Sequence, residues 1–421
     1  MQTPISIFIT ILFSLSLMYC GDKNIPTPCP PNCPVQDTIP YPLEMVWQCF
    51  HTPDSALRGS LGFIVPYQDK YIIYTGFEYG GDKLSYIFIV DRNTGKRVKT
   101  FRGGKNLITT LHVADRFLIV PSWDGANIYD LEKLKLVKTL RGYYHSTNLT
   151  QFGDVVYLKR DYGNVTFSDS SSIIKLHIPS LRTEKVLTIT KEEYGGYTHI
   201  NNISHDIRPN GDTVFYGAMA TEPKKFFCYN QTRKSFEWQT AASDPNDFYL
   251  WHPLFDEEQV YVTSSFGVEA YNKFTGERTW RKEFLGDGSN GIFRPSEPLL
   301  LDGRLYVKQD NEPLYCFRAK DGLILWRNLK AGLAPSNKMS HYKDMLYYVT
   351  RGREFTVVGM ERGNILYKIR GPNDGYRELD REFAPKTMAL LAPVSPLIDK
   401  ENKLMYLQDD RRMYCFKLWE P

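Results

Sequence analysis

The histidines, cysteines and carboxylates of this chain could carry metal or acid–base chemistry, but their spacing in the sequence does not match a motif that would bring them together in a site. The eight His residues show no H-x-H or H-E-x-x-H pattern, which would place two ligands on one element. Residues 286–291 fit G-x-G-x-x-G, yet Pro295 follows them and no βαβ unit surrounds them. Asp287 begins a run like a calcium loop, but its twelfth position is Pro298 instead of Glu. We therefore predict no catalytic residue, no metal site and no cofactor.

The cysteines fall into three groups. Cys29 and Cys33 belong to a Cys-Pro-Pro-Asn-Cys run, where they either form a small disulfide loop or bind nothing. Four others lie in predicted strands and are interpreted as buried thiols: Cys49, Cys228, Cys316 and Cys415. The seventh, Cys20, stands directly after an apolar segment.

That apolar segment predicts export. Residues 5–17 are almost wholly apolar, which matches a signal peptide and is too short for a comfortable membrane span. The context Leu17-Met18-Tyr19-Cys20 resembles a bacterial lipobox, whose cysteine becomes lipidated. A plain secreted protein and an uncleaved anchor are the alternatives. We predict a signal peptide over 1–19 and a lipidated Cys20 with a proline-rich, semi-rigid tether over 20–42.

The elements that remain, over 43–421, form an internal repeat. A strand, a tight turn and a second strand recur, as in Val268–Trp280 and Leu314–Trp326. Eight copies start their turns between Asp91 and Lys417, at intervals averaging about 47 residues, which is typical of four-stranded propeller blades. We predict an all-β, eight-bladed β-propeller of four-stranded blades.

The two ends of the repeat region complement each other. The last copy stops at Pro421, before a fourth strand can form. Residues 43–50, around Trp47, resemble a fourth strand that lacks the first three. We therefore predict that this N-terminal strand completes the last blade, closes the ring and removes both sheet edges.

The turn sequence indicates which propeller this is. Asp91–Gly95, Asn272–Trp280 and Lys320–Trp326 show a turn that ends in Gly, with Trp four residues later in two of them. The pattern resembles the tryptophan-docking repeat of pyrroloquinoline-quinone-like propellers. A WD-type propeller is the competing interpretation, but the chain lacks its Gly-His element. The resemblance implies structural docking by Trp47, Trp238, Trp280 and Trp326, with Lys99 and Tyr367 replacing Trp in other blades.

A lipoprotein built from one such propeller is similar to the BamB-like outer-membrane assembly factors. The resemblance implies a non-catalytic scaffold without cofactor, which is held on the outer membrane of a Gram-negative bacterium and binds another envelope protein. It also implies a monomeric propeller. The near balance of 52 basic and 48 acidic residues argues against nucleic acid as a partner.

Two other functions stay open. A glycan- or peptide-binding module is one, because aromatic and Arg side chains in connecting loops are frequent binding anchors. An enzyme of quinoprotein or lyase type is the other, although the chain lacks the vicinal Cys-Cys pair of quinoprotein dehydrogenases. Packing between blades is the alternative role for Trp251. The candidate interaction residues are Tyr143, Tyr144, His145, Trp251, His252, Tyr376 and Arg377.

The lipobox assignment predicts that Cys20→Ser moves the protein from the membrane fraction to the soluble fraction. Each buried acyl methylene contributes about 0.8 kcal/mol to membrane binding, and the variant carries no acyl chain. Cell fractionation followed by immunoblotting measures the shift against the wild-type chain. Unchanged membrane association of the variant would contradict the assignment.

Overall fold

The computed structural model of the chain describes seventeen segments within one compact unit, Tyr41–Asp374 with Met388–Pro421. Among these described residues, no helix is long and apolar enough to cross a membrane. The described segments are 43–50, 63–77, 85–104, 110–122, 125–142, 149–164, 167–194, 198–221, 223–242, 251–264, 266–284, 295–309, 313–332, 339–350, 354–369, 395–408 and 412–419.

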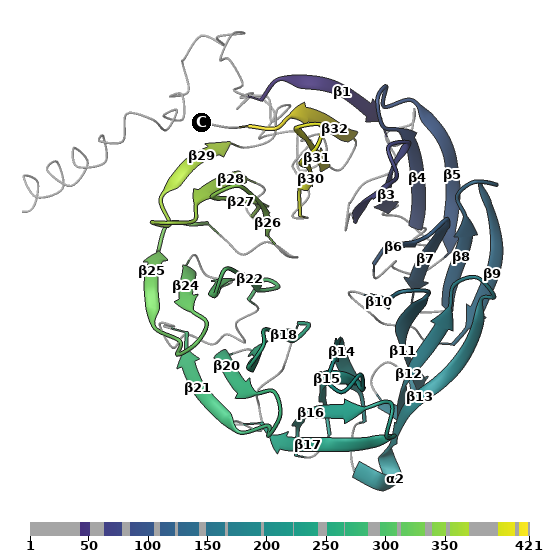
Figure 1. Ribbon diagram of the computed structural model, residues 1–421. Helices are drawn as coiled ribbons and strands as arrows, with labels where there is room; N and C mark the ends of the chain where they lie inside the picture. Colours follow the sequence, from purple (N-terminus) through teal and green to yellow (C-terminus); the bar gives the residue numbers. More distant parts are fainter. Residues whose placement is uncertain are drawn as a thin grey trace, which may run out of the picture. The chain divides into compact units, whose positions relative to one another are not determined.

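Eight antiparallel sheets of four strands follow one another around a ring (Figure 1), which confirms the predicted eight-bladed propeller. We number the blades 1 to 8 in chain order and list each from its innermost to its outermost strand. Blade 1 holds β2 (Ile64–Tyr67), β3 (Tyr71–Phe77), β4 (Ser85–Asp91) and β5 (Arg97–Gly104). Blade 2 holds β6 (His112–Ala114), β7 (Phe117–Ser122), β8 (Gly125–Asp130) and β9 (Lys135–Arg141).

The next three blades have the same order. Blade 3 holds β10 (Thr150–Phe152), β11 (Val155–Asn164), β12 (Phe167–His177) and β13 (Arg182–Thr190), followed by the short helix α2 (Lys191–Tyr194). Blade 4 holds β14 (Ile200–Ile207), β15 (Thr213–Met219), β16 (Lys225–Asn230) and β17 (Ser235–Ala241). Blade 5 holds β18 (Leu254–Phe255), β19 (Gln259–Thr263), β20 (Gly267–Asn272) and β21 (Arg278–Glu283).

The last three blades complete the ring. Blade 6 holds β22 (Leu299–Leu301), β23 (Arg304–Lys308), β24 (Leu314–Arg318) and β25 (Ile324–Asn328). Blade 7 holds β26 (Ser340–Tyr342), β27 (Met345–Val349), β28 (Phe355–Gly359) and β29 (Ile365–Ile369). Blade 8 holds β30 (Leu397–Asp399), β31 (Leu404–Gln408), β32 (Arg412–Lys417) and β1 (Met45–Phe50).

The two middle strands of each blade are buried on both faces. In β3, for example, Ile72, Ile73 and Tyr74 are all fully buried, so the strand is apolar without alternation. Each core cluster draws side chains from two neighbouring blades, as when Ile73 of blade 1 packs with Leu118 of blade 2. The hydrophobic core is therefore a series of layers between blades.

The four docking tryptophans join the outer strand of one blade to the turn of the next. Each indole N–H donates a hydrogen bond to a backbone carbonyl located three residues before a turn glycine. The pairs are Trp47 with Arg92 (2.9 Å), Trp238 with Lys273 (3.1 Å), Trp280 with Ala319 (2.9 Å) and Trp326 with Met360 (2.9 Å). The glycines of these turns are Gly95, Gly276, Gly322 and Gly363, all with positive φ.

Glycine is required in these turns because the indole occupies the space of a side chain. A Cβ atom on Gly276 would lie 2.5 Å from the Trp238 ring, and φ is +72° there. The equivalent residue of blade 4, Lys234, has a φ of 56° and no Trp in the preceding blade, where Lys185 stands instead. Non-glycine residues therefore occur where no indole docks.

The N-terminal strand closes the ring, as predicted. β1 pairs antiparallel with β32, with Trp47 opposite Cys415. Beyond Trp47, the polar contacts between blades 8 and 1 include a buried ion pair of Arg92 with Asp399 and a hydrogen bond from Gln408 to the Thr75 carbonyl (2.7 Å). Residues more than 300 positions apart thus fasten the two ends of the propeller.

Ring closure predicts that Trp47→Ala destabilises the protein by about 3–5 kcal/mol, through the cavity left by the indole and the lost hydrogen bond to Arg92. Urea unfolding followed by fluorescence and circular dichroism measures the change. Val46→Ala is the control, because Val46 is 46% exposed on the same strand. Equal stability of the two variants would contradict a closing role for Trp47.

The indole–glycine contact predicts different costs for alanine at two equivalent turn positions. Gly276→Ala must strain a positive φ and displace Trp238, and should cost about 2–4 kcal/mol. Lys234→Ala keeps a positive φ that a side chain already adopts and meets no indole, so it should cost less than about 1 kcal/mol. Thermal unfolding of the two variants tests this order, and a reversed order would refute it.

Candidate functional site

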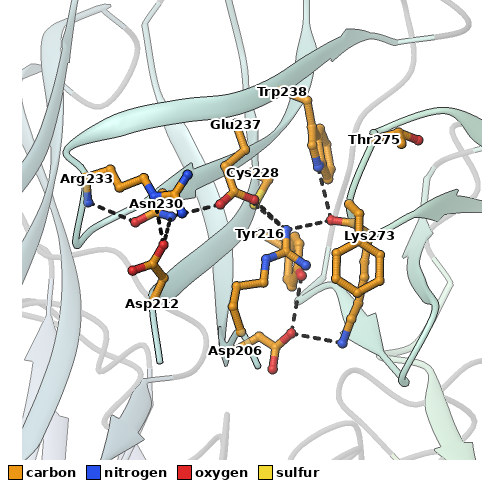
Figure 2. Close-up of polar contacts among 12 residues, drawn as sticks. Asp206, Asp212, Tyr216, Cys228, Asn230, Arg233, Glu237, Trp238, Lys273 and Thr275 are labelled. Atoms are coloured by element: carbon orange, nitrogen blue, oxygen red, sulfur yellow. Dashed lines mark hydrogen bonds and ion pairs between the residues drawn. The ribbon is translucent and has the colours of Figure 1, made fainter. Parts of the chain in front are cut away.

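The most extensive polar network in the described part of the chain lies between blades 4 and 5, at the β14–β15 and β20–β21 turns (Figure 2). Its centre is Arg208, which follows β14 and is 6% exposed. Arg208 Nη2 donates to the Glu237 carboxylate (2.6 Å) and to the Lys273 carbonyl (2.8 Å). Trp238 also donates to that carbonyl, so one backbone oxygen of blade 5 receives two donors from blade 4.

Hydrogen bonds extend this network within blade 4. The Asn230 side-chain amide donates to Glu237 (2.8 Å) and to Asp212 (2.9 Å), as Figure 2 shows. The Arg233 guanidinium pairs with Asp212 (2.8 Å). Asn230 is fully buried at the end of β16, so it fixes both carboxylates relative to the sheet.

Lys273 connects the network to the inner strands. Its Nζ donates to the Asp206 carboxylate (3.1 Å) and to the Asp256 carbonyl (3.0 Å). The Tyr216 hydroxyl donates to the same Asp206 carboxylate (3.3 Å). Lys273 is 8% exposed. Its contacts with Asp206 and Asp256 offset the free energy needed to bury its charge.

These contacts favour the ionised forms of two carboxylates, Glu237 and Asp212. Burial alone would raise the pKa of Glu237, but hydrogen bonds from Asn230 and Arg208 lower it below its usual value. The hydrogen bond from Asn230 lowers the pKa of Asp212. Burial raises the pKa of the Cys228 thiol well above its ordinary value. These pKa shifts favour ionised carboxylates at Glu237 and Asp212 and a neutral thiol at Cys228.

Two apolar side chains are exposed beside this rigid network. Phe274 is 49% exposed in the β20–β21 turn, and Ile207 is 41% exposed at the end of β14. The guanidinium carbon of Arg208 lies 4.7 Å from the centroid of the Phe274 ring, and Lys273 Nζ lies 5.5 Å from it. We call Ile207, Arg208, Lys273 and Phe274 the turn-face patch. It presents an aromatic anchor that two cations hold in place.

A second buried cluster lies between blades 3 and 4. His199 Nδ1 lies 3.1 Å from the Asp161 carboxylate, and Lys159 Nζ lies 2.8 Å from His199 Nε2. Burial would raise the pKa of Asp161, but Lys159 and His199 lower it to about 2. The Ser171 hydroxyl donates to Asp161 (2.5 Å) and not to His199. This arrangement differs from that of an activated serine nucleophile, in which the histidine accepts the hydroxyl proton.

No group of three or more His, Cys, Asp or Glu side chains is placed to hold a metal ion in the described segments. The carboxylates of the two clusters are each bonded to neighbouring cations or amides, as described above.

The structure places Trp251 and His252 just before β18, among contacts between blades. Trp251 Nε1 donates to the Pro295 carbonyl of blade 6 (2.6 Å), and His252 Nδ1 lies 2.7 Å from the Ile203 carbonyl of blade 4. His252 is 7% exposed. These contacts are those expected if the two side chains support packing of the blades. The other candidate interaction residues lie outside the described segments: Tyr143, Tyr144, His145, Tyr376 and Arg377, as does the lipid-attachment candidate Cys20.

The sequence analysis missed the turn-face patch, although a signal was present. Phe274 occupies the second position of the repeated turn, where five other copies carry a polar residue. Those residues are Asn93, Glu132, Thr232, Lys320 and Glu361. An apolar residue at a solvent-facing turn position indicates an interaction site more strongly than an aromatic residue in an irregular loop.

Comparison with known proteins supports the repeat type. Residues 264–411 match the family model described as outer membrane protein assembly factor BamB. No curated protein matches the sequence.

Solved structures share the fold at low sequence identity. The computationally designed Ika8 protein is 10% identical, with a TM-score of 0.56 over 86% of this chain and 98% of that one. BamB from Moraxella catarrhalis is 11% identical, with a TM-score of 0.56 over 89% of this chain and 100% of that one. A europium-containing methanol dehydrogenase is 10% identical, with a TM-score of 0.63 over 89% of this chain and 93% of that one. Identities this low establish the fold alone, which both a binding protein and an enzyme can use.

Proposed function

We propose that the chain is a pyrroloquinoline-quinone-like β-propeller that acts as a non-catalytic scaffold and binds another protein of the bacterial envelope; the family model matched by residues 264–411 supports this. The observation that carries this proposal is the turn-face patch. Phe274 and Ile207 are exposed, while Arg208 and Lys273 beside them are held by buried hydrogen bonds. Aromatic and Arg side chains on a rigid base are the usual energetic centres of protein interfaces.

The rigidity of the patch supports a binding role. Ordering a flexible side chain on association costs free energy, and side chains that are already fixed avoid that cost. Arg208 is bonded to Glu237 and Lys273 before any partner arrives. The patch can therefore recognise a partner surface with an apolar pocket for Phe274.

The proposed location follows from the N-terminal sequence. We propose that a signal peptide over 1–19 is removed, and that lipidated Cys20 and the tether over 20–42 hold the propeller of 43–421 on the outer membrane of a Gram-negative bacterium. The family model named for BamB supports this assignment. In this proposal the propeller is monomeric, takes no cofactor and no nucleic acid, and offers the loops around Tyr143–His145 and Tyr376–Arg377 as further contact loops.

In-cell photo-crosslinking from position 275 tests the proposal. Thr275 is exposed next to Phe274, so a photoreactive residue there should capture an envelope protein identifiable by mass spectrometry. Phe274→Ser combined with Ile207→Ser should lower the captured amount about tenfold or more, since hot-spot residues dominate interface affinity.

Leu323→Ser with Leu329→Ser is the matched control, because these leucines are 50% and 53% exposed on blade 6. This control should leave capture unchanged. An equal loss with both double variants, or no capture from position 275, would refute the turn-face patch as the binding site. Purified protein that takes up calcium and a quinone and oxidises an alcohol would overturn the non-catalytic assignment.

A further inference from the structure

The outer strands of blades 1 and 2 carry only basic charge. β5 contains Arg97, Lys99 and Arg102, and β9 contains Lys135, Lys138 and Arg141, with no acidic residue in either strand. Four of these six side chains belong to exposed residues. We call these four, Lys99, Arg102, Lys135 and Arg141, the basic wall. Figure 1 shows β5 and β9 next to each other on the outside of the ring.

The basic wall has no internal counter-charge in the described part of the chain. None of its four side chains forms an ion pair there, and the single contact recorded for them is Lys99 with the Phe101 ring, at 5.9 Å. The acidic residues nearest to Lys135 in sequence, Asp130 and Glu132, both pair with Arg116 (3.5 and 3.6 Å), and Asp91, which is nearest to Lys99, accepts hydrogen bonds from Thr94. Four exposed cations on two neighbouring strands thus lack a protein anion.

The basic residues of β5 and β9 occur in blades that also differ from the others at the docking position of the repeat. At the docking position, blades 1, 2 and 3 carry Lys99, Lys138 and Lys185, whereas blades 4, 5, 6 and 8 carry Trp and blade 7 carries Tyr367. The facing residues change as well, from the small Cys228, Cys316, Cys415 and Ala270 opposite each Trp to isoleucines opposite each Lys. These isoleucines are Ile89, Ile128 and Ile174.

Protection of sheet edges does not account for this concentration of charge. Charged residues on outer strands do prevent pairing between sheets of different molecules. That requirement applies equally to every blade, yet β25 and β29 carry one basic residue each and β1 carries none. Leu323 and Leu325 are even exposed on blade 6. A local function of blades 1 and 2 explains the difference better.

We propose that the basic wall binds the anionic headgroups of a lipid membrane and so orients the propeller on it. This inference rests on the proposed envelope anchoring through Cys20. The strand that follows the tether, β1, lies in blade 8, and its Trp47 shares a core cluster with Ile72 and Phe88 of blade 1. The chain therefore enters the ring beside the blade that begins the basic wall.

A tether alone holds the propeller near the membrane without orienting it. A proline-rich segment extends about 3.1 Å per residue, so residues 20–42 allow a wide range of positions. The tether also keeps the local concentration of lipid high, which lets a modest electrostatic contact act. Basic side chains near an anionic surface provide such a contact, and salt weakens it.

Vesicle co-sedimentation of the full chain carrying Cys20→Ser tests the proposal without the acyl chains. The protein should bind phosphatidylglycerol-containing vesicles and not pure phosphatidylcholine vesicles, and added salt should release it. The variant Lys99→Gln, Arg102→Gln, Lys135→Gln, Arg141→Gln should bind the anionic vesicles at least about tenfold more weakly.

The matched control is Lys320→Gln, Arg327→Gln, Lys330→Gln, Arg362→Gln, which removes four exposed basic residues from blades 6 and 7. Both quadruple variants lower the formal net charge from +4 to zero, so a general charge effect would weaken them equally. Equal weakening, or no binding by the parent chain, would overturn the proposal. Tighter binding to a DNA duplex than to the vesicles would assign the wall to a nucleic acid.

This experiment is independent of the scaffold function. Crosslinking from position 275 reports on the turn-face patch in blades 4 and 5, whereas vesicle binding reports on blades 1 and 2. Failure of protein capture with intact vesicle binding would refute the scaffold alone. Failure of vesicle binding with intact capture would refute the membrane contact alone.

Discussion

The ring depends on one repeated contact, an indole laid over a glycine of the following blade. The contact has three requirements: a backbone carbonyl that accepts the hydrogen bond of the indole N–H, a turn residue without a side chain, and a small residue opposite the Trp. Trp238, Gly276 and Cys228 meet them between blades 4 and 5. This requirement explains the buried thiols, which supply volume and not reactivity. Burial raises the pKa of Cys316 to about 11, so the thiol remains protonated.

The same contact holds blade 8 against blade 1, and the two ends of the described chain meet within blade 8, where β1 pairs with β32. β1 brings Trp47 from the N-terminal end of the described chain to the turn of blade 1, and β32 supplies Cys415 opposite it. Arg92 and Asp399 add a buried ion pair at this junction. Because loop-closure entropy opposes contacts between distant residues, the junction between blades 8 and 1 needs more interactions than a junction between successive blades. The polar contacts there meet this need.

The sequence predicted most of the fold because each blade is encoded locally. A strand, turn and strand within thirteen residues is visible without knowing any long-range contact, and the unpaired strand at Trp47 implied closure. The candidate site could not be found in this way. Arg208 and Lys273 are 65 positions apart and meet through adjacent turns of two blades. Lys159 and His199 likewise meet across a blade boundary. A periodic pattern fixes the order of the blades, but not which polar side chains face each other between them.

The docked tryptophans are unevenly distributed around the ring, and this distribution affects which kind of partner each part of the ring can bind. Between blades 4 and 7 each turn is clamped by an indole, so a residue displayed there, such as Phe274, has a fixed backbone beneath it. Blades 1 to 3 replace the indole by Lys99, Lys138 and Lys185, and their cohesion comes from apolar layers such as Ile119 against Leu158. Precise recognition of a protein needs a rigid display, whereas attraction to a charged surface needs only accessible cations. The docked half of the ring therefore suits a specific partner, and the lysine-substituted half suits an extended anionic surface.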